Sequence, residues 1–244
     1  DRHDYYTAVA PGRINIIGEH TDYNLGLAMP IGIDRWICSI VSIRDDNRFN
    51  IYSCNFNEKV SVDFDELKDD VVDSWKKYVF GCLKIFIDEY NIDKGINILI
   101  GGNIPIGFGM SSSAALEVSI LSSLSHAFDK KIDGYKILEL SHKVENDFLG
   151  IKSGLLDQYA SVFSKKNKPL CIDFSAMSHI YIDSNIKDAS WVLINSMVDR
   201  SLVDSKYNDR VNECIKGLKF VNEVFKDIRM NELTQEHLEI LIDK

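Results

Sequence analysis

A glycine-rich segment, residues 101–115, constrains the fold of this chain more than any other stretch. An alternating apolar run, residues 96–100, leads into it and predicts a strand. Three serines then open a segment rich in helix-forming residues, so we expect a helix N-terminus there, with serine as its cap. Free backbone N–H groups at such an end favour an anion, and glycines let a bulky polyanion approach the backbone. The segment therefore predicts either an anion site or a tight turn between strand and helix.

Two familiar glycine motifs do not account for this loop. The chain has no Gly-Lys-Ser or Gly-Lys-Thr sequence, which excludes a phosphate loop of the Walker type. A nucleophile elbow is excluded as well, because Gly109 and Ser111 are followed by Ser113 where that motif requires glycine. A phosphate bound at this loop would therefore be held without the usual lysine.

Composition narrows the class of protein. The formal net charge of −9 argues against nucleic acid as a partner, since phosphate backbones would be repelled. The five cysteines are scattered and never spaced as Cys-x-x-Cys, so we expect a reducing, cytoplasmic setting without a zinc knuckle or a disulfide framework. The sequence has no 18-residue apolar run and begins with a polar segment, so we expect no membrane span and no signal peptide.

A second polar cluster, residues 18–24, follows a short apolar run near the N-terminus. It places Glu19, His20 and Asp22 within four residues. A solvated loop would explain it, and so would a metal site formed by His20 and Asp22, although that pair lacks a third ligand. The third interpretation is sugar recognition, because carboxylates accept hydrogen bonds from hydroxyls and histidine can donate or accept them.

The remaining periodicity predicts a mixture of strands and helices. Val60, Val62 and Phe64 alternate with polar residues, so their strand should have one solvent-facing side. Glu145 lies beside the apolar stripe of a predicted helix, where a lone glutamate is usually solvated. Strands are expected at residues 31–43, 49–53, 60–64, 170–174, 180–183 and 191–195, and helices at 75–90, from the glycine loop to about 128, at 134–149 and at 207–225.

Two segments carry a resemblance to a known family. Residues 12–24 resemble the signature of the galactokinases, and residues 105–115 resemble the second motif of the wider GHMP small-molecule kinases. The resemblance implies an α+β fold, with a GHMP kinase N-terminal domain of the ribosomal protein S5 domain 2-like type, a mixed sheet with helices packed on it. That domain, which binds sugar and nucleotide, is expected over residues 1–185, and the beginning of a second α+β domain over residues 186–244.

The resemblance also implies an activity. A galactokinase transfers phosphate from ATP to the anomeric hydroxyl of D-galactose, giving galactose 1-phosphate for the Leloir pathway of galactose catabolism. The implied co-substrate is ATP, the implied metal is Mg²⁺, and the implied state is a cytoplasmic monomer. Galactokinases continue well beyond residue 244 into a second domain with a third glycine-rich motif, so we expect a truncated chain that is inactive or nearly so by itself.

Individual site residues are implied by the same resemblance. Residues 150–158 match the family element Gly-x-x-x-Gly-x-x-Asp-Gln, which makes Asp157 the catalytic carboxylate and Arg13 its cationic neighbour. Asp157 would accept the hydroxyl proton or act electrostatically, since pairing with Arg13 would keep it ionised. The implied magnesium ligands are Ser113 and Glu145. The implied sugar-binding residues are Glu19, His20, Thr21, Asp22, Gly154 and Tyr207, and the implied nucleotide-binding residues are Ser53, Trp75, Gly107, Phe108, Gly109, Met110, Ser111, Ser112 and Ser113.

Other interpretations of these residues remain open. Asp157 could satisfy backbone N–H groups at a helix start, and Trp75 and Tyr207 could be core residues. The chain has Ser153, Arg200 and Val211 where the family often has Cys, His and Arg.

Alternative functions are a kinase acting on N-acetylgalactosamine or galacturonate, a non-catalytic galactose and ATP sensor, and a generic nucleotide-binding module. The intact residues 111–115 and Asp157 argue against the sensor, and the cluster at residues 19–22 argues against the generic module.

Overall fold

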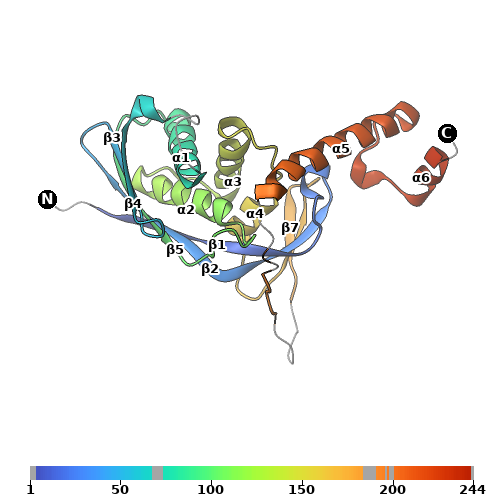
Figure 1. Ribbon diagram of the computed structural model, residues 1–244, viewed down its shortest axis with the longest axis horizontal. Coiled ribbons are helices and arrows are strands. Elements are labelled where there is room, and N and C mark those ends of the chain that lie inside the picture. The colour runs from blue at the N-terminus through green and yellow to red at the C-terminus, as the bar shows by residue number, and fades with distance from the viewer. Residues whose placement is uncertain (1–3, 68–73, 184–190, 196, 198–200, 243–244) are drawn as a thin grey trace. The chain divides into compact units, whose positions relative to one another are not determined.

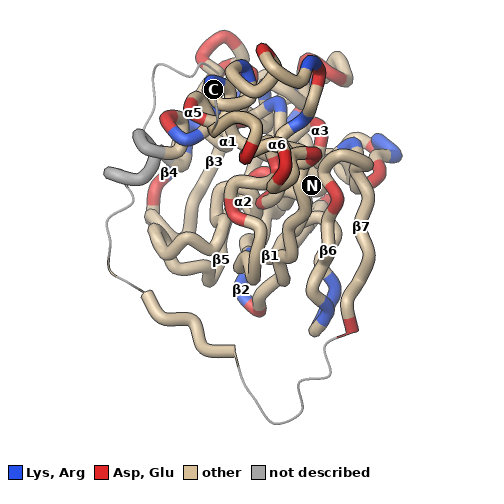
Figure 2. Tube along the Cα trace, turned by 90° about the vertical axis from the view of Figure 1, so that its right-hand side faces the viewer, with Lys and Arg blue, Asp and Glu red and all other residues tan. Residues whose placement is uncertain are grey.

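The computed structural model describes residues 4–67, 74–183, 191–195, 197 and 201–242. Acidic residues (red) are spread over many elements of the chain, as expected from its negative charge (Figure 2). None of the helices in these described ranges combines the length and the apolar character that crossing a membrane requires.

The chain divides into two compact units, and each is described by itself. The domain boundary expected at residue 185 stays a prediction, and residues 184–190 lie outside the described part of the chain. The first unit comprises Asp1–Ile14 and Ile31–Asn167, and the second comprises Asn15–Pro30 and Lys168–Lys244.

A mixed β-sheet forms one layer of the first unit. Its strand order is β4-β3-β5-β2, and β1 pairs with β2. β3 runs parallel to β5, whereas the β3–β4 and β2–β5 pairs are antiparallel, which confirms the predicted mixed sheet. The strands are β1 (Tyr6–Ile17), β2 (Leu27–Ile43), β3 (Arg48–Ser53), β4 (Glu58–Asp63) and β5 (Ile96–Gly102).

Helices cover one face of this sheet (Figure 1). Ile96, Ile98 and Ile100 alternate along β5 and are buried in one core with the apolar stripes of α1 and α2. This alternation arises because successive strand residues point to opposite faces of a sheet. The helices are α1 (Ser74–Tyr90), α2 (Ser112–Ala127), α3 (Gly134–Lys143) and α4 (Leu156–Phe163).

The predicted helix over residues 134–149 changes its geometry partway. The α-helix α3 ends at Lys143 and continues as a π-helical turn, η3 (Val144–Phe148). The N–H of Leu149 donates to the carbonyl of Val144 at 3.0 Å, which is the wider i to i+5 spacing. The predicted stripe is still buried, with Val144 fully inaccessible, but Glu145 lies in the π-turn and not on the α-helix.

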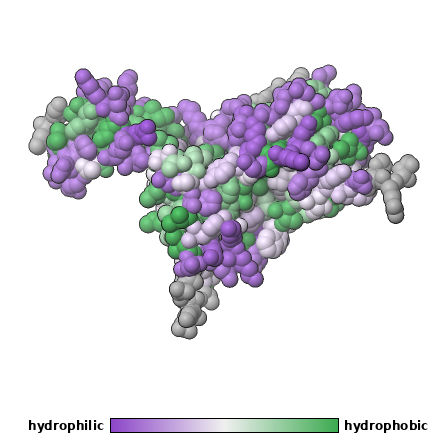
Figure 3. All heavy atoms as spheres, turned by 180° about the vertical axis from the view of Figure 1, so that it is seen from behind, coloured by the Kyte–Doolittle hydropathy of each residue, from purple (hydrophilic) through white to green (hydrophobic). Residues whose placement is uncertain are grey.

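The second unit contains a small antiparallel sheet and the C-terminal helices. The first residues of β2 pair with β6, and β6 pairs with β7. Hydrophobic residues (green) lie among polar ones on the surface of the C-terminal helices (Figure 3). Phe220 and Leu238 of these helices are exposed. The elements are η1 (Asp22–Asn24), β6 (Leu170–Asp173), β7 (Ser178–Tyr181), α5 (Ser201–Phe225), η4 (Met230–Glu232) and α6 (Gln235–Ile242).

The strand predicted at residues 191–195 is wrong. These residues have no regular structure, and the side chains of Trp191, Val192 and Ile194 are exposed. An apolar run becomes a strand only when a neighbouring strand satisfies its backbone, and none among the described residues pairs with it. The family departure at Arg200 lies outside the described residues.

Candidate functional site

The glycine loop ends in backbone conformations that few residues adopt easily. Gly107 and Gly109 have φ values of 78° and 77°, and Ser111 has a φ of 55°. The N–H of Arg13 donates to the Met110 carbonyl at 3.1 Å, so β1 supports the loop from one side. The loop therefore reaches α2 in a defined shape, with Ser111 immediately before the first helical turn.

The serine cap that the sequence predicts for α2 is not formed by Ser111. Ser111 occupies the N-cap position, but its side chain makes no capping hydrogen bond. Instead its hydroxyl donates a short hydrogen bond to Oδ2 of Asp157. The prediction failed because a left-handed backbone at Ser111 turns the hydroxyl away from the helix and towards α4. The positive end of the 16-residue helix α2 is thus left without a capping contact from Ser111, which suits an anion.

Arg13 holds the other oxygen of the same carboxylate. Its Nε donates to Asp157 Oδ1 at 2.9 Å, Nη2 bonds the same oxygen, and Nη1 donates to the Gly109 carbonyl at 2.8 Å. The side chains are 14% exposed for Arg13 and 34% for Asp157, so the pair is largely shielded but reachable. The structure thus brings together the predicted catalytic pair, the glycine loop and the start of α4.

A buried glutamate lies near the Asp157 carboxylate, and the sequence analysis did not identify it. Glu117 in α2 is fully inaccessible, and Gln158 Nε2 donates to its Oε2 at 3.4 Å. Burial raises the pKa of Glu117 well above its ordinary value, and the charge of Glu145 raises it further. The Oε1 atoms of Glu117 and Gln158 are buried without a hydrogen-bond partner. A charged residue flanked by Leu116 and Val118 was the available signal in the sequence.

The residues predicted to hold magnesium lie in the first unit. Ser113 is in the first turn of α2, and Glu145 is in the π-turn η3 and only 7% exposed. Within the described residues, no group of three or more His, Cys, Asp or Glu side chains could hold a metal ion. A hydroxyl and a carboxylate nevertheless fit Mg²⁺, which prefers oxygen ligands and keeps several waters. The electrostatic influence of Glu145 on Glu117 also places negative charge in this region.

The two other residues predicted to lie near the nucleotide are both buried. Trp75 is 9% exposed, belongs to the core and stacks on Phe56 with ring centroids 5.5 Å apart and planes 6° apart. Ser53 is 2% exposed, and its Oγ accepts a hydrogen bond from the Phe56 N–H at 3.4 Å. Both therefore have structural roles at Phe56, and their contact with a nucleotide stays a prediction.

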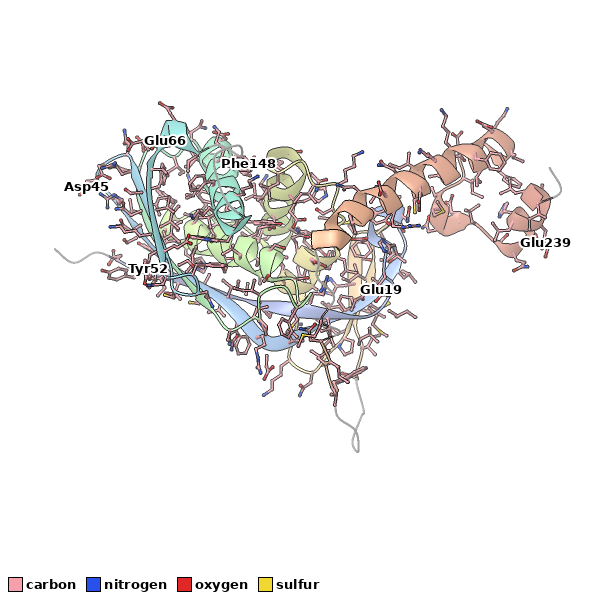
Figure 4. The ribbon with its side chains drawn as sticks, viewed as in Figure 1. Glu19, Asp45, Tyr52, Glu66, Phe148 and Glu239 are labelled. Atoms are coloured by element: carbon pink, nitrogen blue, oxygen red, sulfur yellow. The ribbon has the colours of Figure 1, made fainter. Side chains whose placement is uncertain are left out.

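The predicted sugar-binding residues form a local cluster in the second unit, with one exception. Glu19 is exposed just beyond the end of β1 (Figure 4). Asp22 is the first residue of η1, and Thr21 Oγ1 donates to the carbonyls of Gly18 at 2.6 Å and Leu27 at 2.8 Å.

The rings of His20 and Tyr207 lie 5.6 Å apart, with Tyr23 beside both. The exception is Gly154, which belongs to the first unit and precedes α4. The roles of all these residues stay predictions.

Two family models match the chain. The GHMP kinases N terminal domain matches residues 77–165, and the galactokinase galactose-binding signature matches residues 1–43. The first contains the glycine loop and Asp157, and the second contains Arg13 and the cluster from Glu19 to Asp22.

Curated relatives of this chain are galactokinases. A galactokinase of Staphylococcus carnosus is 38% identical over 219 residues, which is 88% of this chain and 56% of that protein. A galactokinase of Clostridium perfringens is 37% identical over 238 residues, covering 96% of this chain and 62% of that protein. The chain thus spans less than two thirds of the length of these relatives.

Solved structures agree with these sequence matches. A Lactococcus lactis galactokinase, crystallised in complex with galactose, matches with a TM-score of 0.85 and 30% identity over 98% of this chain and 63% of that chain. A mevalonate kinase of Methanococcus jannaschii matches with a TM-score of 0.67 and 18% identity, which shows the shared fold alone.

The mixed sheet, the helices on one face and the loop leading into α2 define a GHMP kinase fold, and the chain belongs to that superfamily. Within the superfamily, the galactose-binding signature and the galactokinase relatives assign the chain to the galactokinase family.

Proposed function

We propose that the whole protein transfers the terminal phosphoryl group of ATP to the anomeric hydroxyl of D-galactose. The observation that carries the proposal is the Asp157 carboxylate, which Arg13 and Ser111 hold between them beside the glycine loop. The membership of the galactokinase family supports the choice of substrate. We place the protein in the cytoplasm, in line with its scattered free cysteines, and we expect a monomer, as the family resemblance implies.

The glycine loop and the N-terminus of α2 are suited to hold the phosphates of ATP. The transition state of phosphoryl transfer is loose, so catalysis depends mainly on positioning and on neutralising charge. Gly107 and Gly109 shape the loop through their positive φ values, and the uncapped start of α2 presents the positive end of its dipole. These features supply backbone N–H groups in place of a Walker lysine.

Asp157 is suited to take the proton of the attacking hydroxyl. As the sugar oxygen forms its bond to phosphorus, the bond to ADP breaks, and ADP leaves with the bonding electrons. The hydroxyl proton passes to Asp157, which Arg13 and Ser111 keep in one orientation. Arg13 is bonded to both the carboxylate and the Gly109 carbonyl, so it links the proton acceptor to the phosphate loop and adds positive charge there.

Ser113 and Glu145 would hold Mg²⁺, which neutralises charge on the phosphates when it is bound. The sugar would be oriented by Glu19, His20, Asp22, Gly154 and Tyr207. A site that pairs with a particular hydroxyl rejects an epimer strongly, because its buried polar groups are left unpaired.

The test is a kinase assay on the whole protein, with galactose 1-phosphate detected by phosphorus NMR. N-acetylgalactosamine and galacturonate serve as competing substrates in the same assay. Asp157→Asn should lower kcat by about 10²–10⁴-fold while galactose still binds, because the proton acceptor is lost and the shape of the site is kept. Asp88→Asn is the matched control, since Asp88 is an exposed residue of α1 that forms a surface ion pair with Lys84. A kcat for Asp157→Asn equal to that of the control would refute the assignment.

A further inference from the structure

The loop of residues 18–26 holds His20 in an unusual backbone conformation. The φ of His20 is 63°, a left-handed value that residues other than glycine adopt rarely. Asn24 Nδ2 donates to the His20 carbonyl at 2.8 Å, and the Gly26 N–H donates to the Thr21 carbonyl at 2.8 Å. Such a conformation persists only where the surrounding contacts stabilise it. The hydrogen bonds of this turn therefore fix the backbone position of His20.

Tyr23 contacts the imidazole of His20 directly. Its hydroxyl oxygen lies 2.7 Å from Nδ1 of His20, and the two ring centroids are 5.9 Å apart with planes at 70°. His20 is exposed whereas Tyr23 is half-buried, so the less mobile phenol restrains the exposed imidazole. The phenol can donate to Nδ1 or accept from it, so the contact holds the ring in one orientation and couples the protonation of Nδ1, and with it that of Nε2, to the direction of the phenol O–H.

Tyr23 is itself anchored within the second unit. Its ring meets that of Tyr207 edge-on, with centroids 5.8 Å apart and planes at 82°. Cys214 of α5 lies close enough to the Tyr23 phenol to influence its pKa, and Asn24 Nδ2 donates to the Cys214 sulfur at 3.5 Å. Burial raises the pKa of Tyr23 to about 12, with Cys214 adding to the effect, so the phenol keeps its proton.

We propose that Tyr23 is a positioning residue for sugar recognition, whose hydroxyl fixes the orientation and tautomer of His20 and whose ring sets the spacing between His20 and Tyr207. The inference rests on the proposed function, because His20 and Tyr207 are the residues expected to meet galactose. Tyr23 lies within the matched galactose-binding signature but is not among the residues individually expected to bind galactose, so it would act only through its neighbours.

The test compares Tyr23→Phe with the wild-type whole protein. The variant keeps the ring contacts and loses the hydroxyl, so KM for galactose should rise about fivefold, with kcat and KM for ATP unchanged. Tyr52→Phe is the matched control, because Tyr52 also donates a 2.7 Å hydrogen bond, to Asn57, on a strand of the other unit. Its galactose KM should equal that of the wild type.

A second measurement separates positioning from a general loss of structure. Nitrogen NMR of labelled histidine should show one tautomer of His20 in the wild type and a mixture in Tyr23→Phe. The proposal is overturned if His20 shows the same tautomer in both proteins, or if the tautomers mix while the galactose KM stays unchanged. If the wild type did not bind galactose, the proposed function would be refuted, and with it the role of Tyr23 in sugar recognition. The histidine spectra would still report the contact between Tyr23 and His20.

Discussion

Replacing Gly12 with alanine should push the glycine loop away from the strand that supports it. A Cβ at Gly12 would lie 2.5 Å from the Met110 carbonyl oxygen and 3.1 Å from Cδ1 of Ile104. The Ile104 side chain can rotate, but the carbonyl belongs to the loop backbone. Relief to an ordinary contact of 3.4 Å therefore requires the loop to retreat by about 0.9 Å.

This displacement has a stability cost and a binding cost. Overpacking of this kind destabilises a protein by about 1–3 kcal/mol. The same carbonyl accepts the 3.1 Å hydrogen bond from the Arg13 N–H, so the loop would lose its tie to β1 as it moves. Loop amides displaced by nearly 1 Å no longer meet phosphate oxygens at hydrogen-bond distance. We expect the affinity for an ATP analogue to fall by about tenfold or more, which corresponds to about 1.4 kcal/mol.

Two other glycines supply the controls. Nothing lies within 4 Å of a Cβ at Gly217, an exposed position in α5, so Gly217→Ala should stabilise the helix slightly and leave nucleotide affinity unchanged. Gly107 also has open space around it, but its φ is 78°. Gly107→Ala should therefore cost about 1 kcal/mol through backbone strain alone.

The assay is titration calorimetry with magnesium and a non-hydrolysable ATP analogue, beside thermal unfolding of each variant. The reasoning requires Gly12→Ala to lose both affinity and thermal stability relative to Gly217→Ala. If Gly12→Ala bound the analogue within twofold of the wild type at an unchanged Tm, the loop would not be held by this contact.

Two further predictions concern the residues around Asp157. Because the folded pKa of Glu117 is raised above 4.5, the folded chain holds that proton more tightly than the unfolded chain, and stability should fall above about pH 4.5 by up to about 1.4 kcal/mol per pH unit. Glu117→Gln removes this titration, so its Tm advantage over the wild type should grow between pH 5 and pH 8, and a constant difference would contradict the buried carboxyl. Ser111→Gly and Ser111→Ala both remove the hydroxyl that donates to Asp157, but only glycine adopts a φ of 55° without strain. Ser111→Gly should therefore melt about 2–4 °C higher than Ser111→Ala. Equal melting temperatures would show that the left-handed backbone stores no strain.

Much of the scaffold could be predicted from local pattern. The alternation in residues 96–100 and the stripe of α1 follow from burial on one face, which each short segment records in its own sequence. The glycine loop and its helix were predictable for the same reason, because Gly, Ser and Ala have strong local preferences. Arg13 and Asp157 were paired through resemblance to a family, since nothing local connects residues 144 positions apart.

The failures have a physical cause in common. A serine hydroxyl was expected to cap α2, and Glu145 was expected on a regular α-helix, because both expectations used only neighbours in sequence. In the folded chain, the Ser111 hydroxyl donates its hydrogen bond to Asp157, and Glu145 lies in a π-turn. Glu117 was overlooked because a glutamate among helix formers satisfies every local rule until its burial is known.

These departures from regular structure are concentrated around one carboxylate. Ser111 has a left-handed backbone and bonds Asp157, Glu117 is buried without full pairing and bonds the adjacent Gln158, and the π-turn holds Glu145 beside them. Each of them lowers stability, and an ordinary N-cap, a leucine and a straight α-helix would remove all three costs. Local rules broken together at one place mark a site where selection acts on binding more than on stability. The structural irregularities therefore support the same location for the catalytic centre as the family motifs do, and they do so without reference to any relative.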